Sequence, residues 1–149
     1  PSTKERLQDD VKAALKAGDR ARLGVLRMVM AAIKQREVDS RETLDDAAVL
    51  SILEKMVKQR QDAISQFERG NRGDLVAKET AEIDVIRTYL PEPLDETAIT
   101  ALIDAAIADT GAAAPSDMGR VMAEIKKNAA GRVDMGQISQ LVRAQLSAS

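Results

Sequence analysis

The chain has 149 residues, a net charge of −2 at pH 7, and neither histidine nor cysteine. Disulfides, thiol nucleophiles, the commonest general base and the usual transition-metal ligands are therefore excluded. Hydrophobic residues make up 44% of the sequence and aromatic residues only 1%, so the core must be aliphatic, as is typical of packed helices. We expect an all-α protein with no metal site and no cofactor.

No apolar run approaches the roughly 18 residues that a membrane span needs, and no signal peptide is visible. We therefore expect a cytoplasmic protein that does not contact a membrane.

The first ninety residues begin with two helices, predicted from their 3.6-residue hydrophobic period. A Ser2-x-x-Glu5 capping box begins the first helix, and Gly18 ends it. Asp19 caps the second helix, over residues 20–37. Apolar residues on most sides of this second helix place it at the centre of a bundle: Leu23, Val25, Leu26, Met28, Val29, Met30 and Ile33.

Two further helices follow. The third is predicted over residues 46–69, and the segment Gly70-Asn-Arg-Gly73 breaks it. Asp74 then caps the fourth, which continues to Leu90. The inward-facing stripes are Val49, Leu53, Met56, Val57, Ile64 and Phe67 on the third helix, and Val76, Ile83, Ile86 and Leu90 on the fourth.

Pro91 and Pro93 stop the fourth helix, because neither residue can donate a helical hydrogen bond. We place a domain boundary there, between a four-helix domain (1–90) and a three-helix domain (91–149). The three shorter helices of the second domain are predicted over 96–110, 117–128 and 135–147. The last of these turns Ile138, Leu141, Val142 and Leu146 inward.

Residues 116–136 form the most informative stretch of the second domain. Two Asp-Met-Gly turns begin at Asp117 and Asp134. A helix N-terminus attracts phosphate, but a carboxylate at that end repels it. We therefore interpret Ser116 and Asp134 as N-caps, and expect Gly119 and Gly136 to allow close approach of a neighbouring helix.

The basic residues of this stretch are the main candidate site. Residues 1–90 carry 17 basic and 16 acidic side chains, and residues 91–149 carry 5 and 8. Within the acidic half, residues 118–133 hold four basic groups and only one acid, Glu124. Lys126 and Lys127 end a helix and Arg132 follows, so these three charges are expected to gather at one corner. Cations at a helix C-terminus also complement the helix dipole, which is the alternative interpretation.

Two further residues border this basic corner. Arg143, on the last helix, would extend it. Arg120 would instead pair with Glu124 one turn later.

Several segments in a fixed order resemble the GatB/YqeY family, from about Leu7 to Leu146. In that family the tail domain closes the GatB subunit of the Asp/Glu-tRNA amidotransferase. The segments are Leu26-Arg-Met-Val-Met-Ala-Ala-Ile-Lys34, Glu79-Thr-Ala-Glu-Ile-Asp-Val-Ile86, Tyr89-Leu-Pro-Glu-Pro-Leu94, Asp117-Met-Gly-Arg-Val-Met122, Gly131-Arg-Val-Asp134 and Ile138-Ser-Gln-Leu-Val142.

The resemblance implies a free-standing tail-like protein that binds tRNA, or assists an amidotransferase or an aminoacyl-tRNA synthetase component. The chain has no segment resembling the catalytic cradle and no pattern to which a catalytic residue can be assigned. We therefore expect no enzyme activity from the chain alone. Two alternatives remain: a helical protein-interaction module without RNA binding, and a carbon–nitrogen ligase component that takes its amide nitrogen from glutamine.

A second basic stripe is predicted on the first domain. Arg20, Arg27 and Lys34 recur every seven residues on the second helix, and Arg27 and Lys34 are candidates for additional RNA contact. Lys55, Lys58 and Arg60 cluster on the third helix. Both groups could contact RNA or an adjacent protein, or form a solvated surface with Glu54, Asp62 and Glu68 as partners. Phe67 and Tyr89 are not expected to stack on bases, which leaves structured RNA read by shape and phosphate.

Overall fold

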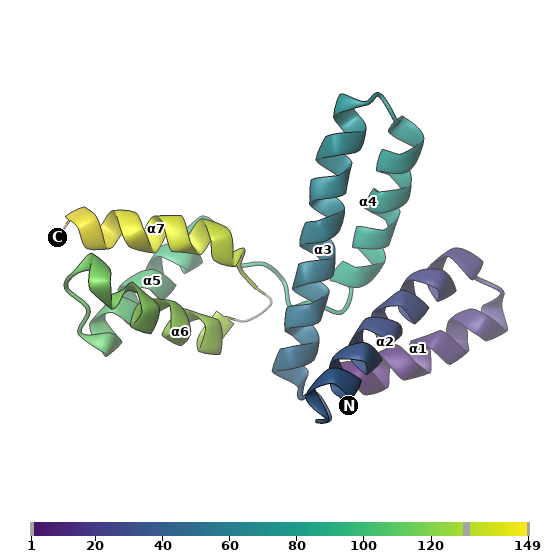
Figure 1. The fold of residues 1–149 in the computed structure, drawn as a ribbon, viewed down its shortest axis with the longest axis horizontal. Coiled ribbons are helices and arrows are strands. Elements are labelled where there is room, and N and C mark those ends of the chain that lie inside the picture. Colours follow the sequence, from purple (N-terminus) through teal and green to yellow (C-terminus); the bar gives the residue numbers. More distant parts are fainter. Residues whose placement is uncertain (1, 130–131, 149) are drawn as a thin grey trace. The chain divides into compact units, whose positions relative to one another are not determined.

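The computed structural model describes residues 2–129 and 132–148 (Figure 1). Within these ranges the chain forms seven α-helices, one 3-10 turn and no strand, which confirms the predicted all-α fold. Internal contacts divide the chain into two compact units, unit 1 (Pro1–Pro91) and unit 2 (Glu92–Ser149).

Unit 1 consists of two helical hairpins (Figure 1). The first pairs α1 (Thr3–Ala17) with α2 (Arg20–Ser40), and the second pairs α3 (Asp46–Arg69) with α4 (Gly73–Arg87). Helices α2 and α3 each contact the other three helices of the unit. Helix α2 was predicted to be buried on most sides, but only Leu23, Val25, Leu26, Val29 and Ile33 are buried. It continues to Ser40, three residues beyond the predicted end, and stops where Arg41 adopts a left-handed conformation with φ 57°.

The helix ends of unit 1 follow from local capping. Ser2 Oγ accepts a hydrogen bond from the Glu5 amide at 3.1 Å, and Gly18 ends α1 with φ 68°. Asp19 Oδ1 accepts from the Arg22 amide at 3.1 Å and begins α2. Each side-chain oxygen satisfies an amide that has no intrahelical partner. These predicted caps are confirmed.

The predicted cap of α4 is wrong. Asp74 lies inside the first turn of the helix, and Arg72 occupies the N-cap position without a side-chain cap bond. The guanidinium of Arg72 holds both carboxylate oxygens of Asp74, with Nε–Oδ1 at 3.2 Å and Nη2–Oδ2 at 3.0 Å. The Asp74 carboxylate therefore forms an ion pair with Arg72 and does not act as the N-cap of α4.

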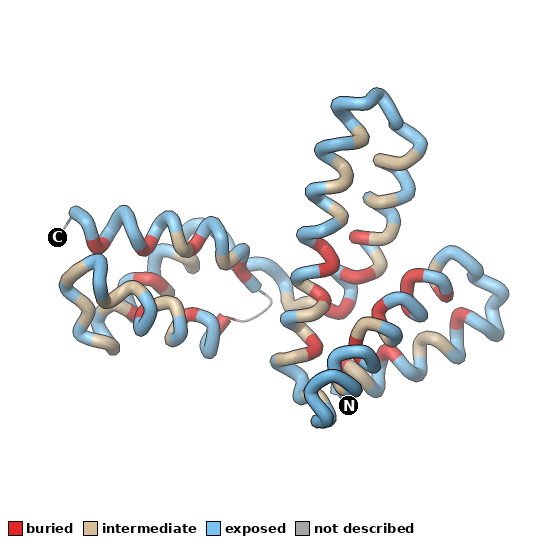
Figure 2. Tube along the Cα trace, viewed as in Figure 1, coloured by how far each residue is buried: buried red, intermediate tan, exposed pale blue. Residues whose placement is uncertain are grey.

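The core of unit 1 lies where the two hairpins meet, and residues 58–82, the outer part of the α3–α4 hairpin, include no buried residue (Figure 2). Ile64, Phe67 and Val76, predicted to face inward, are accordingly only half-buried. Met28 is 41% exposed, contrary to prediction. The buried apolar residues are Leu7, Ala14, Leu23, Val25, Leu26, Val29, Ile33, Val49, Leu53, Met56, Val57, Ile83, Ile86 and Tyr89.

Unit 2 contains α5 (Glu96–Thr110), the 3-10 turn η1 (Pro115–Asp117), α6 (Met118–Ala129) and α7 (Met135–Ala148). Helix α6 contacts both α5 and α7 (Figure 1). Leu141, predicted to face inward, is 42% exposed. The core consists of small and aliphatic residues: Ile103, Ala106, Val121, Ile125, Ala129, Val133, Ile138, Val142 and Leu146.

The start of unit 2 is tied to the segment that follows α6. The Leu94 amide donates to the Arg132 carbonyl oxygen at 3.0 Å, and Arg132 Nε donates to the Glu92 carbonyl oxygen at 3.2 Å. Asp95 Oδ1 then accepts from the Ala98 amide at 2.8 Å and begins α5. Glu92 and Leu94, on either side of Pro93, therefore bond within unit 2.

Candidate nucleic-acid interface

The last turn of α6 carries two exposed lysines, Lys126 and Lys127. Within residues 2–129 and 132–148, neither forms an ion pair or a side-chain hydrogen bond. Their charges add favourably to the negative end of the helix dipole, for a few tenths of a kcal/mol. Because each ammonium group projects into solvent without a carboxylate partner, both are available to an external anion.

Arg132 lies directly beyond these lysines, because its amide donates to the carbonyl oxygen of Ala129, the last residue of α6, at 3.0 Å. Its side chain is exposed, and its Nε is bonded to the Glu92 carbonyl oxygen. The two Nη groups have no partner in the part of the chain that the structure describes. The backbone tie fixes the base of the side chain and leaves the outer edge of the guanidinium free. Gly131 of the sequence motif lies outside the described residues.

Arg120 does not belong to the corner, because it lies at the other end of α6. The predicted pairing with Glu124 is wrong. Arg120 Nη2 donates to Asp117 Oδ1 at 2.7 Å, and Nη1 donates to the Thr110 carbonyl oxygen at 3.0 Å. Glu124 instead accepts from Asn128 Nδ2 at 3.3 Å. The arginine thereby joins the end of α5 to the start of α6, which is a structural role.

Asp117 forms the other half of this junction. Its Oδ2 accepts from the amides of Ala113 and Ala114 at 3.0 and 3.2 Å. These amides, first that of Ala113, and the guanidinium of Arg120 lower the pKa of Asp117 to about 2. The predicted cap at Ser116 is wrong, because the helical turn already begins at Pro115, which places Ser116 inside it.

Asp134 caps α7 as predicted, since its Oδ1 accepts from the Gly136 amide at 2.9 Å. A Cβ at Gly136 would lie 3.3 Å from this same oxygen, so the glycine leaves room for the cap rather than for another helix. A Cβ at Gly119 would meet no described atom within 4 Å. The predicted close helix approach at the two glycines is therefore wrong.

Arg143 is exposed on α7 and has no ion pair among the described residues. Eight residues separate it from Met135, the first residue of α7, which corresponds to roughly 12 Å along the helix axis at 1.5 Å per residue. It would therefore lengthen a basic surface rather than join the corner.

On unit 1 the three stripe residues of α2, Arg20, Arg27 and Lys34, are all exposed. None forms an ion pair in the described parts of the chain. Arg20 and Arg27 also line an open hollow of about 400 Å³ at the α1–α2 turn. Its other lining residues are Ala14, Leu15, Gly18, Leu23 and Gly24.

Of the basic cluster Lys55, Lys58 and Arg60 on α3, Arg60 forms an ion pair with another helix of unit 1. Arg60 Nε donates to Glu82 Oε2 of α4 at 3.0 Å, and both side chains are nearly buried, at 12% and 13% exposure. Arg60 Nη1 also donates to the Met56 carbonyl oxygen at 3.1 Å. The predicted solvated position of Arg60 is therefore wrong, whereas Lys55 and Lys58 remain exposed.

A polar network that the sequence did not predict surrounds Tyr89, the single tyrosine. The Tyr89 hydroxyl donates to Asp10 Oδ2 at 2.5 Å and accepts from Arg22 Nη2 at 3.3 Å. The guanidinium carbon of Arg6 lies 5.3 Å from the ring centroid. Burial, and next the hydrogen bond to Asp10, raise the pKa of Tyr89 to about 12. No local pattern joins Tyr89 to Arg22 and Asp10, which lie 67 and 79 positions away in the sequence.

Comparison with known proteins decides the family. A family model described as Yqey-like protein matches residues 4–146. The chain belongs to the YqeY-like family. The resemblance inferred from its motifs is thereby confirmed, and the match spans both units.

Curated relatives of this YqeY-like chain share one name, "Altered inheritance of mitochondria protein 41, mitochondrial". The relative from Pyrenophora tritici-repentis is 30% identical over 148 residues, which cover 96% of this chain and 80% of that protein. The relative from Lachancea thermotolerans is 38% identical over 85 residues, and that from Kluyveromyces lactis 37% over 84. These two matches cover 56% of this chain and only 46% and 45% of the relatives, so the matched region is about half of each relative's length.

The relatives are named as mitochondrial proteins, whereas the sequence predicted a cytoplasmic location for this chain. The cytoplasmic location stays a prediction. Among the described residues, no single helix has the length and apolar character needed to cross a membrane. Only Glu96–Thr110 and Pro115–Ala129 taken together reach that length and composition, and they are bent by 96°. The described residues also contain no group of three or more acids placed to hold a metal ion.

Proposed function

We propose that this YqeY-like protein binds structured RNA of the tRNA class, with Lys126 and Lys127 as its main phosphate contacts. The observation that carries the proposal is the pair of exposed lysines without ion-pair partners in the described residues, at the end of α6. Phosphate contacts need only cations on a matching surface and supply most of the affinity for nucleic acid.

Arg132 supports this proposal by geometry. Because its Nε is held by the Glu92 carbonyl oxygen, the guanidinium loses little freedom when its outer edge bonds to a phosphate. Arg143 would add a contact farther along α7, and Arg27 and Lys34 would add contacts from unit 1. Arg120 is not included, since both of its Nη groups are already bonded.

The family resemblance supports the choice of tRNA, because the corresponding tail of the amidotransferase GatB subunit contacts tRNA. An accessory role beside an amidotransferase or an aminoacyl-tRNA synthetase follows from the same analogy. The described residues present no aromatic platform for single-stranded bases, since Phe67 is half-buried and Tyr89 is 3% exposed. The expected mode is therefore recognition of shape and phosphates.

The proposal is tested by fluorescence anisotropy with labelled total tRNA at low and at physiological salt. The test variant is Lys126→Glu/Lys127→Glu, which leaves the hydrogen bonds of Arg132 intact. We expect it to weaken binding at least about tenfold, because two phosphate contacts become repulsive. The matched control is Arg36→Glu/Lys78→Glu, which makes the same charge change at exposed residues of α2 and α4 that have no ion pair in the described chain.

The control should change the dissociation constant less than about twofold, since neither residue belongs to the proposed contacts and exposed charges outside a contact are largely screened at physiological salt. Equal weakening by both variants would show a non-specific charge effect, and absence of binding at low salt would overturn the RNA proposal. Arg27→Glu/Lys34→Glu is a third variant, and an intermediate loss is expected if unit 1 contributes contacts.

A further inference from the structure

The hollow at the α1–α2 turn is lined by apolar side chains that differ in their exposure to solvent. Ala14 and Leu23, at 4% and 9% exposure, form its buried apolar floor. Leu15 lies at its rim and is 59% exposed, one of the most exposed large apolar side chains described. An apolar concavity with an exposed apolar rim is typical of a docking site.

Gly24 is the second observation. It lies within α2, is exposed, and lines the hollow. A Cβ built there would meet no described atom within 4 Å, so no packing contact within the described chain requires a glycine. Glycine inside a helix costs about 1 kcal/mol relative to alanine. The open space above Gly24 is therefore a feature that the described fold itself does not use.

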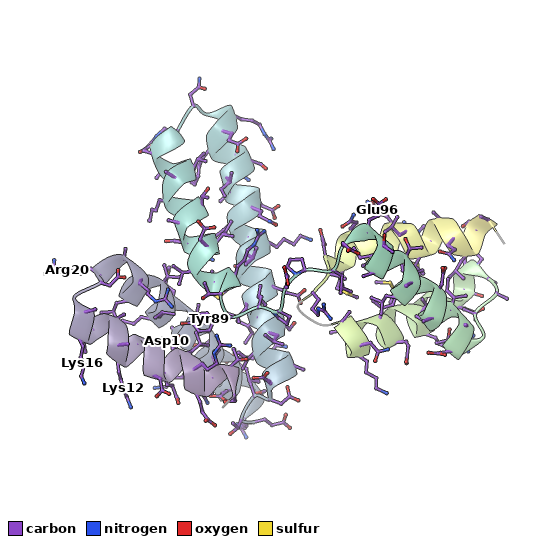
Figure 3. All side chains as sticks on the ribbon, turned by 180° about the vertical axis from the view of Figure 1, so that it is seen from behind. Asp10, Lys12, Lys16, Arg20, Tyr89 and Glu96 are labelled. Atoms are coloured by element: carbon purple, nitrogen blue, oxygen red, sulfur yellow. The ribbon has the colours of Figure 1, made fainter. Side chains whose placement is uncertain are left out.

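The charged residues that line the hollow are Arg20 and Arg27. Both are exposed and form no ion pair within the described residues. Lys12 and Lys16 extend into solvent from α1 but do not line the hollow (Figure 3). Asp19, next to Arg20 in the sequence, accepts a hydrogen bond from the Arg22 amide and keeps its negative charge, but it does not line the hollow either. The lining is therefore positively charged, which fits an acidic partner.

We propose that this hollow binds an acidic amphipathic helix of a partner protein. Apolar side chains of that helix occupy the space above Gly24, between Leu15 and Leu23, and its flanking carboxylates face Arg20 and Arg27. A groove between two helices suits apolar anchors spaced at i, i+4 and i+7. RNA fits less well, because its phosphates would satisfy the cations but leave the apolar floor unfilled. This partner is different from the tRNA proposed for unit 2, and Arg27 is the residue assigned to both.

The test uses a labelled synthetic alanine-based helix with leucines at i, i+4 and i+7 and glutamates on both flanks. Two control peptides replace either the glutamates by lysines or the leucines by serines. Binding to the full chain is measured by anisotropy at physiological salt. We expect micromolar binding of the acidic peptide and at least about tenfold weaker binding of each control, which corresponds to about 1.4 kcal/mol.

The decisive variant is Gly24→Leu, which fills the hollow. Leucine is the better helix former and its Cβ would meet no described atom within 4 Å, so the variant should melt at a higher temperature than the parent while losing at least about tenfold in peptide affinity. Arg20→Gln should weaken peptide binding a few-fold without changing stability, because Arg20 is exposed and forms no ion pair in the described chain. Lys126→Glu/Lys127→Glu should leave peptide binding unchanged.

Three results would overturn the proposal: no binding of the acidic peptide at about 1 mM, equal binding by Gly24→Leu, or equal binding of the lysine-flanked peptide. Competition by tRNA for the peptide, together with loss of tRNA affinity in Gly24→Leu, would assign the surface to RNA instead. Loss of tRNA binding in Lys126→Glu/Lys127→Glu with intact peptide binding keeps the two proposals separate.

Discussion

The polar contacts inside unit 1 differ from those inside unit 2. In unit 1, ion pairs join helices far apart in sequence: Lys4 Nζ lies 2.9 Å from Glu37 Oε1, and Arg60 Nε lies 3.0 Å from Glu82 Oε2. In unit 2 the ion pair among described residues is local, between Arg120 and Asp117 at 2.7 Å. Both units have an aliphatic core and capped helices. Unit 1 adds ion pairs between distant helices, whereas a side-chain contact between distant helices of unit 2 is a hydrogen bond from Gln145 Nε2 to Asp104 Oδ1 at 2.6 Å.

Cations that hold the fold together can thus be told apart from cations that are free to bind an external anion. In unit 1, Arg60 and Lys4 cannot be changed without leaving a carboxylate unpaired. In unit 2, Lys126 and Lys127 hold no helix pair together among the described residues, so their reversal should alter a surface and not the fold.

The largest effect is expected from a cavity in the small core of unit 2. Ile138 is fully buried, and Ile138→Ala should cost about 2–5 kcal/mol. A domain of this size has little stability in reserve, so unit 2 should unfold while unit 1 stays folded. Differential scanning calorimetry should show the loss of one transition. The loss of all cooperative unfolding would mean that the units depend on each other.

The second-largest loss of stability is expected from breaking the Arg60–Glu82 ion pair. Arg60→Met leaves a nearly buried carboxylate without its cation, and we expect a loss of about 2–3 kcal/mol in urea unfolding. Arg120→Met, at an arginine that is 59% exposed, should cost less than about 1 kcal/mol. The double variant Arg60→Met/Glu82→Leu should recover most of the loss. Equal costs at Arg60 and Arg120 would contradict the contrast between the units.

Alkaline pH should act on unit 1 through Tyr89, the only tyrosine. Its pKa of about 12 lies above the ordinary value of 10.0, so folding disfavours the phenolate. The resulting stabilisation is complete below about pH 10 and is lost as the pH rises toward 12. Absorbance at 295 nm reports this one group directly.

Asp10→Asn should lower the titration midpoint of Tyr89 while keeping it above 10, because burial is the larger cause of the shift. Tyr89→Phe should cost about 1 kcal/mol of stability. A midpoint of 10 in the parent would show that the hydroxyl is not held as described.

The smallest effect is expected from acid on unit 2. The pKa of Asp117 is about 2, below the ordinary value of 3.8, so its stabilisation is present above about pH 4 and is lost as the pH falls toward 2. Asp117→Asn should remove this part of the acid dependence of unit 2 and slightly lower its melting temperature at neutral pH. Circular dichroism melts at pH 7 and pH 3 give the comparison, and an unchanged pH dependence would count against the junction.

Sequence predicted the features that are encoded within one or two helical turns. The bounds of α3 and α5 match the predicted 46–69 and 96–110, because Asp45, Asp95 and the following glycines mark those ends. The predicted N-caps were wrong at two helix starts, because a neighbouring residue changed the local structure there. Arg72 captures Asp74, and Pro115 starts the helical turn before Ser116.

The candidate site was predicted in part. The exposure of Lys126, Lys127 and Arg143 followed from the helical period, which separates core from surface positions. The Arg60–Glu82 pair spans 22 positions and joins two helices, so no pattern within a single helix reveals it. The hollow above Gly24 likewise depends on how α1 and α2 pack, which the sequence alone did not provide.

The most direct test of the central claim, that the end of α6 is a phosphate-binding surface, is the salt dependence of tRNA binding. The slope of log K against log salt should become shallower in Lys126→Gln/Lys127→Gln by about 0.7–0.9 for each phosphate that the protein no longer neutralises. The same slope should be unchanged in Arg36→Gln/Lys78→Gln. A parent slope retained in the lysine variant would contradict the claim, since the bound phosphates would then be neutralised elsewhere.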